Sequence, residues 1–420
     1  QKIAKQSNEK IFKELDWISK NKLLFFYNAD SNFGLLKEHI DIVKYMTDLK
    51  KKTGYPDNIR IDWAKSKADK VVELAQLLTK AKMMKGITIA LQSMNPEVLK
   101  AIKRKNVDNG KLKEFFDLYK DENLVSYVEL ILGLPMETVE SFKDGMFQVL
   151  DLEYNDFISI YPMTALPNTP FFDPEYIKEY EIDIVETTPA FFHHEHPESL
   201  KNESEYMVVG SKTMTREQYI EASMWKWLFM FGYSLGHLKY IAKFIKSVKN
   251  VSYKEFYEKF YTYMVDNPNS FMGKQYLITK STLGKVLKKE TLWGRVVDLT
   301  GNFYWDFEEA TALEVALNRD EFFDSVREFL SQFNLNETVE DDIITFQSSI
   351  IKNPLEKYPM MKKFNYNIKD VLFSNQKLKN SGYTYQFDSE NYKNDVREWC
   401  IKAIWWGRRN KGFETVVYEK

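Results

Sequence analysis

Residues 125–137 read VSYVELILGLPME, and this stretch decides the fold. It is a short, continuous apolar run that closes with Gly133 and Pro135, and a strongly helical pattern opens with Glu137. The pattern predicts a buried parallel strand that leads into a helix. Glu129 lies within the run, where an unpaired charge would be costly, so we expect it to have a partner on the inner face of the strand.

Four more apolar runs alternate with helical patterns before residue 170. They cover residues 23–27, 59–63, 86–91 and 157–161. Because the connections are short, this alternation favours right-handed βαβ units around a parallel sheet. In parallel α/β barrels the functional groups gather where the strands end, and the run at 86–91 ends in the polar residues Gln92 and Ser93.

Short motifs at these strand ends resemble one enzyme superfamily. They are YNADSNFG at 27–34, IALQSMN at 89–95 followed by VLK at 98–100 and IKR at 102–104, ELILGLPMET at 129–138, and IYPMTALPNTP at 160–170. In this order they resemble the radical S-adenosylmethionine (radical SAM) superfamily, and more narrowly its cobalamin-binding-domain branch. The resemblance is strong over residues 1–170 and continues less diagnostically through the C-terminal half.

The resemblance implies an α/β fold with a partial (β/α)6 TIM-like barrel over residues 1–170, lacking its first strand. In the superfamily that strand is followed by a CxxxCxxC loop, whose thiolates hold three irons of a 4Fe-4S cluster. The only cysteine of this chain is Cys400. The resemblance therefore implies a fragment that begins at Gln1, just after the cluster loop, with the cluster ligands and a cobalamin domain upstream. We expect the fragment alone to be inactive.

The resemblance also places residues that bind S-adenosylmethionine (SAM) at the strand ends, while catalytic residues are not identified. The cofactor-binding candidates are Asp30, Asn32, Lys65, Gln92, Ser93, Arg104, Glu129, Gly133, Tyr161, Pro162 and Asn168. Asp30 and Asn32 stand where many superfamily members carry a Gly-Gly-Glu-type motif that takes the amino group of the methionine moiety. The alternative is a loop that caps the next helix, a place that Asp and Asn also favour.

The next candidates offer polar groups for the rest of the cofactor. Gln92, Ser93 and Arg104 provide uncharged hydrogen-bonding groups and a guanidinium fork, which suit ribose hydroxyls and a carboxylate. Alternatively Ser93 and Asn95 cap the following helix and Arg104 is solvated. Lys65 is placed either to bind the same carboxylate or as a solvated lysine.

The last candidates follow the two final strands, near which the resemblance places adenine. Glu129 would orient the ribose or the substrate, and Gly133 permits close approach to a ligand. Tyr161, Pro162 and Asn168 belong to a rigid loop whose backbone groups would pair with an adenine edge, although turn formation alone also selects prolines. Glu137 is interpreted as a first-turn acid that favours its helix dipole.

Beyond residue 170 the sequence becomes aromatic and helical. We interpret residues 171–212 as a connecting or substrate loop and 213–420 as a mainly helical domain with a small α+β end. The patterns predict one long or two consecutive helices over 215–246, with Thr215 and Gln218 in capping-box spacing, and one helix each over 253–264 and 307–333. The aromatic cluster Trp225, Trp227, Phe229 and Phe231 is assigned to the core.

Composition limits the remaining alternatives. The chain has 59 basic and 61 acidic side chains, a net charge of -2, so no global field favours nucleic acid or a membrane surface. A single cysteine argues against a disulfide framework and fits a cytoplasmic protein. His193, His194 and His196 are metal-ligand types, but such close neighbours rarely point at one ion. A His-ligated metallohydrolase is therefore the less favoured alternative.

The leading hypothesis is an enzyme in which a reduced cluster cleaves SAM and the 5′-deoxyadenosyl radical abstracts a hydrogen atom, with methyl transfer to carbon as the outcome in the cobalamin branch. The expected partners are a small-molecule or biosynthetic-intermediate substrate and an electron donor such as flavodoxin or ferredoxin. The alternative from a different class is a barrel that has lost its cluster and only binds a ligand or partner.

Overall fold

The computed structural model describes residues 5–64, 68–84, 86–190, 192–193, 197–200, 203–390, 399–406 and 412–419. The chain forms two compact units, and each is described by itself. The first comprises Gln1–Leu91, Val107–Glu129 and Leu152–Phe157, and the second comprises Gln92–Asn106, Leu130–Asp151 and Ile158–Lys420. The division expected from the sequence, with boundaries after residues 170 and 212, stays a prediction.

The first unit alternates helices and short strands. Its helices are α1 (Asn8–Lys20), α2 (His39–Thr53), α3 (Ala68–Lys80) and α5 (Asn109–Asp121), and its short strands are β1 (Phe25–Tyr27) and β2 (Asn58–Arg60). The two strands pair in parallel, with Phe26 opposite Ile59. Ile59 also forms a parallel bridge with Met84, which shortly precedes the next strand. Buried aliphatic side chains, among them Val43, Ala75 and Leu78, hold α2 and α3 together.

The longer strands form one sheet. They are β3 (Ile87–Gln92), β4 (Ser126–Leu132) and β5 (Phe157–Pro162), in the order β3-β4-β5. Each of the five strands expected from the sequence is therefore present. Together with the helices between them they confirm the α/β class.

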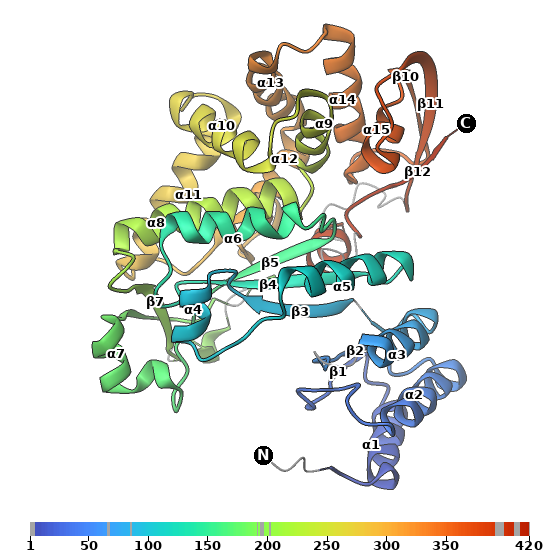
Figure 1. Cartoon of the computed structure of the whole chain (residues 1–420), viewed down its shortest axis with the longest axis vertical. Helices are drawn as coiled ribbons and strands as arrows, with labels where there is room; N and C mark the ends of the chain where they lie inside the picture. The colour runs from blue at the N-terminus through green and yellow to red at the C-terminus, as the bar shows by residue number, and fades with distance from the viewer. Residues whose placement is uncertain are drawn as a thin grey trace. The chain divides into compact units, whose positions relative to one another are not determined.

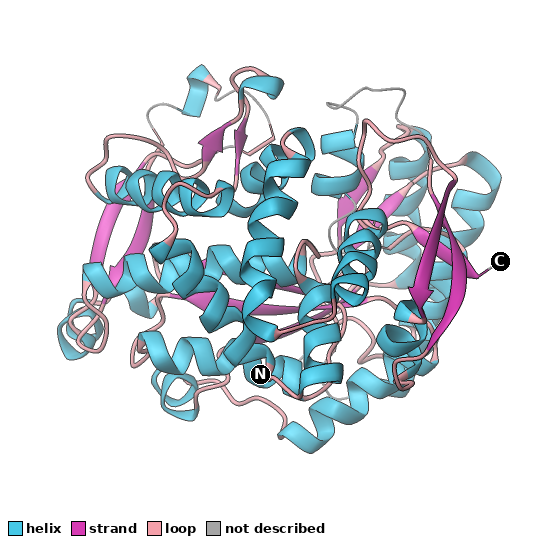
Figure 2. Cartoon of the chain, turned by 90° about the horizontal axis from the view of Figure 1, so that it is seen from above, coloured by secondary structure: helices cyan, strands magenta, loops and turns pink. Residues whose placement is uncertain are grey.

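The second unit is mainly helical, and helices predominate over strands throughout (Figure 2). Its helices are α4 (Pro96–Ala101), α6 (Val139–Asp151), α7 (Pro174–Tyr180), α8 (Arg216–Phe229), α9 (Lys239–Lys249), α10 (Tyr253–Asp266), α11 (Phe271–Leu287), α12 (Phe307–Leu317), α13 (Arg319–Leu330), α14 (Glu337–Ile350) and α15 (Ile368–Ser374). A π-helical turn, Met230–Ser234, continues α8, and a second π-helical segment covers Cys400–Trp406. Short 3₁₀ turns cover Pro170–Phe172, Glu198–Leu200, Asp298–Thr300 and Ser331–Phe333.

Three small antiparallel sheets complete the second unit. They are β6 (Asp183–Thr187) with β7 (Glu205–Gly210), β8 (Arg295–Val296) with β9 (Tyr304–Trp305), and β10 (Met360–Tyr366), β11 (Asn380–Asp388) and β12 (Val416–Glu419) in that order. Helix α8 packs against α6, α11 and α12 (Figure 1).

The aromatic side chains of α8 form part of the core. Trp225, Trp227, Phe229 and Phe231 are all buried, as the sequence predicted. The capping box at the start of α8 is also confirmed, since the Thr215 hydroxyl accepts from the Gln218 amide and the Gln218 side chain accepts from the Thr215 amide. The single helix expected over 307–333 is wrong, because the chain divides at Asn318 into α12 and α13. Among the described helices, none is both long enough and apolar enough to cross a bilayer.

Candidate functional site

A buried hydrogen bond in the second unit joins the loops after β3 and β4. The Ser93 hydroxyl donates to Glu137 Oε2 at 2.7 Å, and the Ser141 hydroxyl donates to the other carboxylate oxygen. Glu137 is only 1% exposed, and its burial raises its pKa, although the Ser141 and Ser93 hydroxyls oppose the rise. We call Ser93, Glu137 and Ser141 the strand-end clamp. Glu137 precedes α6 and anchors the clamp, so its interpretation as a first-turn acid is wrong.

The segment after β3 is shaped by further local bonds. Gln92 ends the strand in the left-handed region, at a φ of 68°. The Asn95 side chain caps α4 by accepting from the Glu97 amide, and the Ser93 hydroxyl accepts from the Asn95 amide at 3.1 Å. Asn106 reaches back to donate to the Ser93 carbonyl at 2.9 Å. Arg104 is exposed near the end of this segment, so its guanidinium is open to a ligand.

A residue without a Cβ is required at position 133, because the backbone of another segment of the protein approaches it closely. Its φ is 98°, and a Cβ at this position would lie 2.9 Å from the Val208 carbonyl oxygen of β7. The Thr213 hydroxyl then donates to the Glu137 carbonyl at 2.7 Å. The turn from Gly133 to Glu137 is thus supported by the segment that follows β6.

Two backbone amides of the loop after β5 are bonded within the protein. The Met163 amide donates to the Leu132 carbonyl, and the Ala165 amide donates to the Tyr206 carbonyl, both at 2.7 Å. Tyr161 and Pro162 are half-buried, and Asn168 is exposed in a turn with a φ of 64°. Of the loop amides, those of Met163 and Ala165 are therefore already used within the protein.

The remaining candidates belong to the first unit or lie outside the described residues. The Asp30 carboxylate accepts from the Asn32 amide at 2.8 Å, and the Asp30 amide donates to the Asn28 side chain at 3.2 Å. Asn32 is exposed, and Glu129 is half-buried within β4. Lys65 lies outside the described residues. Asp30, Asn32 and Glu129 belong to the first unit, and the other described candidates belong to the second unit.

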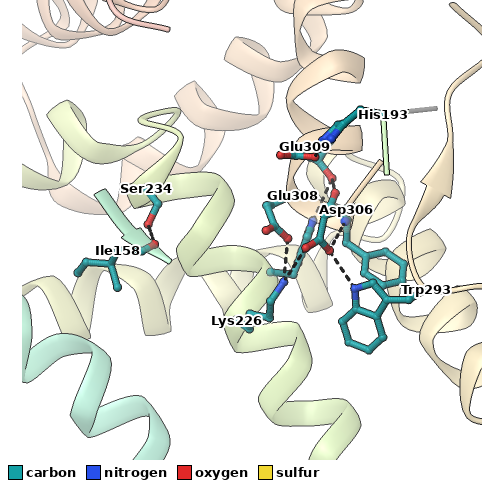
Figure 3. Close-up of polar contacts among 11 residues, drawn as sticks. Ile158, His193, Lys226, Ser234, Trp293, Asp306, Glu308 and Glu309 are labelled. Atoms are coloured by element: carbon teal, nitrogen blue, oxygen red, sulfur yellow. Dashed lines mark hydrogen bonds and ion pairs between the residues drawn. The ribbon is translucent and has the colours of Figure 1, made fainter. Parts of the chain in front are cut away.

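A buried group of charges, which the sequence did not predict, lies at the start of α12 (Figure 3). Lys226 of α8 is 1% exposed, and its ammonium lies 3.1 Å from Glu308 Oε2 and 3.4 Å from Asp306 Oδ2. The Trp293 indole donates to Asp306 Oδ1 at 3.0 Å, and the same oxygen accepts from the Phe307 amide. We call Lys226, Trp293, Asp306 and Glu308 the buried charge cluster.

The charges of this cluster are strongly coupled by burial. Burial and the charge of Asp306 raise the pKa of Glu308 to about 8, while Lys226 opposes the rise. Burial lowers the pKa of Lys226, but Asp306 and Glu308 outweigh it, so the net direction is upward and the ammonium stays charged. The cluster therefore holds a permanent cation between two acids, one of which takes up a proton near neutral pH.

His193 lies next to this cluster. Its Nε2 is 2.8 Å from Glu309 Oε2, and both side chains are buried (Figure 3). His194 and His196, the other two members of the candidate metal-ligand set, lie outside the described residues. Within the described part of the chain, no group of three or more His, Cys, Asp or Glu side chains is arranged to hold a metal ion.

The sequence of this chain is similar to those of two curated methyltransferases. No family model matches it. It is 26% identical over 369 residues to the cobalamin-dependent radical SAM methyltransferase TokK of Streptomyces tokunonensis, an alignment that covers 84% of this chain and 54% of TokK. It is also 26% identical over 363 residues to the 2-(S-pantetheinyl)-carbapenam-3-carboxylate methyltransferase of Streptantibioticus cattleyicolor, covering 82% of this chain and 53% of that protein.

The chain thus spans about half the length of the curated relatives it matches. Among solved structures, the radical SAM methyltransferase TsrM of Kitasatospora setae is 16% identical and matches 40% of this chain and 33% of its own, with a TM-score of 0.31. A TM-score of this size does not establish a shared fold. The two sequence alignments nevertheless cover most of the chain. The chain is therefore homologous to cobalamin-dependent radical SAM methyltransferases, which confirms the resemblance seen in its sequence.

Proposed function

We propose that this chain forms the SAM-binding and substrate-binding part of a cobalamin-dependent radical SAM methyltransferase that acts on a small molecule. The observation that carries the proposal is the similarity to TokK, which extends over 84% of the chain. We also propose that the strands form part of a (β/α)6 barrel. The parallel pairing of β1 with β2, and the bridge from Ile59 to Met84 just before β3, support that arrangement.

Each unit by itself offers polar groups whose chemistry suits a part of SAM. In the second unit, Gln92 offers an amide at the end of β3 and Arg104 offers an exposed cation after α4, which suit ribose hydroxyls and a carboxylate. In the first unit, Asp30 offers a carboxylate for an ammonium group. The Ser93 hydroxyl donates to Glu137, and we propose that Ser93 supports Gln92 through the strand-end clamp.

The 420 residues do not provide the ligands of a 4Fe-4S cluster. Three thiolates are needed, whereas Cys400 is the only cysteine and is buried. When bound, the cluster and cobalamin would supply electron and methyl transfer, so the proposal requires that residues outside these 420 hold both groups. The work of this chain is then to bind SAM, to orient the substrate and to exclude water. A flavodoxin or ferredoxin is the proposed electron donor.

The test is SAM binding by the full-length protein, reconstituted with iron, sulfide and cobalamin without oxygen. Replacing Arg104 with Ala should weaken SAM binding at least about tenfold, because a charge-assisted hydrogen bond contributes about 1.5 to 3 kcal/mol. Lys105→Ala is the matched control, since it removes the same charge from the next exposed residue and should leave affinity unchanged. Equal affinities for Arg104→Ala and the parent would contradict the assignment of Arg104.

The alternative function is a binding module without a cluster, which the lack of thiolates in the 420 residues favours. The same preparation separates the two. A full-length protein that binds no iron and does not cleave SAM would support the binding module and overturn the enzyme.

A further inference from the structure

The loop that carries Asp30 is held by a buried histidine at the start of α2. His39 is 4% exposed and stacks on Phe33, with the ring centroids 4.2 Å apart and the planes 2° from parallel. Phe33 is itself fixed, because its amide donates to the Asp62 carbonyl and its carbonyl accepts from the Ala64 amide. The imidazole therefore has one well-defined plane and cannot turn freely.

One hydrogen bond to His39 determines where its proton lies. The Gly34 amide donates to Nδ1 at 2.6 Å, so Nδ1 must be unprotonated. Burial also lowers the pKa of His39, which keeps the ring neutral. A neutral imidazole then carries its proton on Nε2, and this nitrogen lies 3.4 Å from Asp30 Oδ2. The ring thus connects the Gly34 backbone to the Asp30 carboxylate.

Asp30 is left in a state suited to bind a cation. One of its oxygens accepts from the Asn32 amide, and the other faces His39. Its side chain remains 39% exposed, so each oxygen keeps a lone pair for a ligand. The neutral imidazole orients the Asp30 carboxylate without cancelling its charge. In many metal sites a carboxylate orients a ligating histidine through the same kind of contact, whereas here the histidine would orient the carboxylate.

We propose that His39 is a positioning residue, which orients Asp30 to accept the primary ammonium group of the methionine moiety of SAM. This inference rests on the proposed function. It adds a residue that the sequence motifs did not indicate, because His39 lies beyond the 27–34 stretch and becomes a neighbour of Asp30 only when the loop folds back onto α2.

The first test is a double-mutant cycle on SAM binding by the full-length, reconstituted protein. His39→Phe keeps a ring for the stack on Phe33 and removes both nitrogens, so SAM affinity should fall about three- to tenfold. In an Asp30→Ala background the same change should have no further effect, since His39 acts through Asp30. His39→Gln, whose amide can place a donor near the Nε2 position, should recover part of the affinity.

The control is His237→Phe, because His237 is also buried and stacks on an aromatic ring, that of Phe231, at 4.7 Å. It should leave SAM affinity unchanged. The second test needs no cofactor: ¹⁵N NMR of the imidazole should show the His39 proton on Nε2.

Three outcomes would overturn the inference. They are an equal loss for His39→Phe with and without Asp30, no loss in either background, and a proton on Nδ1. In all three cases the parent protein could still bind SAM, so the proposed function would not be contradicted. A parent that does not bind SAM would overturn both.

Discussion

Replacing Lys226 with Met should destabilise the second unit strongly and in a pH-dependent way. Methionine is a similarly long, unbranched side chain without a charge, so the change removes the ammonium that lies 3.1 Å from Glu308 and 3.4 Å from Asp306. Removing one partner of a buried ion pair costs about 3 to 5 kcal/mol. At pH 6 the loss should be smaller, about 1 to 3 kcal/mol, because Glu308 can remain protonated and neutral.

The sign of the pH effect follows from Glu308. Its pKa is about 8 in the folded protein, above its ordinary value, so the folded state binds the extra proton and stability falls as pH rises through 8. Without Lys226 the folded pKa rises further, and the loss should continue to higher pH. The second change Glu308→Gln removes the titrating group, so Lys226→Met in a Glu308→Gln background should cost less and depend less on pH.

The assay is urea unfolding at pH 6 and pH 8.5, followed by tryptophan fluorescence, which reports on the neighbouring Trp293 and Trp227. Lys259→Met is the control, because Lys259 is half-exposed and lies 3.7 Å from Glu255 on the same helix, and it should change stability by less than about 0.5 kcal/mol. A loss below about 1 kcal/mol for Lys226→Met at both pH values would refute the reasoning.

Three further predictions concern the strand-end clamp, its glycine and a buried histidine. Ser93→Ala removes a donor from a buried carboxylate and should cost about 1 to 3 kcal/mol of stability, measured by urea unfolding. An unchanged free energy of unfolding would contradict a stabilising role for the Ser93–Glu137 hydrogen bond. Gly133→Ala should lower the free energy of unfolding by at least about 1 to 2 kcal/mol, because its φ is positive and the new Cβ would approach the Val208 carbonyl. Its control, Gly284→Ala in α11, has no atom within 4 Å of the new Cβ and should raise the free energy of unfolding by up to about 1 kcal/mol. Equal melting temperatures for the two variants would contradict this prediction. Burial lowers the pKa of His237 to about 3. The parent should therefore lose stability as pH falls below 6.5, by at most about 1.4 kcal/mol per pH unit. In the variant His237→Phe, stability should depend less on pH between pH 6.5 and 4.

Local patterns predicted the elements where a strong period or cap is present. The run at 125–137 contains β4 and leads into α6, which begins at Val139, and the Thr215 capping box opens α8. The sequence gives weaker signals where apolar residues lie on all sides of a helix. For this reason the sequence does not predict α11. The patterns indicate one helix over α12 and α13 because the residue that separates them, Asn318, is neither Gly nor Pro.

The candidate site could be predicted only in part, because its main contacts join distant segments. The motifs contain both Ser93 and Glu137, but nothing in them indicates the bond between these residues across 44 positions. Lys226 meets Glu308 across 82 residues, and nothing local to either residue indicates the other. The Gly133 signal was read correctly as a close approach, but the approaching group is the backbone of β7.

Cleavage of SAM by the full-length protein can be measured in one product analysis. The protein is reconstituted with iron, sulfide and cobalamin without oxygen and incubated with SAM and a reductant, and the nucleoside products are identified by mass spectrometry. We expect SAM to be cleaved to 5′-deoxyadenosine. A full-length protein that binds no iron and leaves SAM intact would contradict the proposed radical SAM activity.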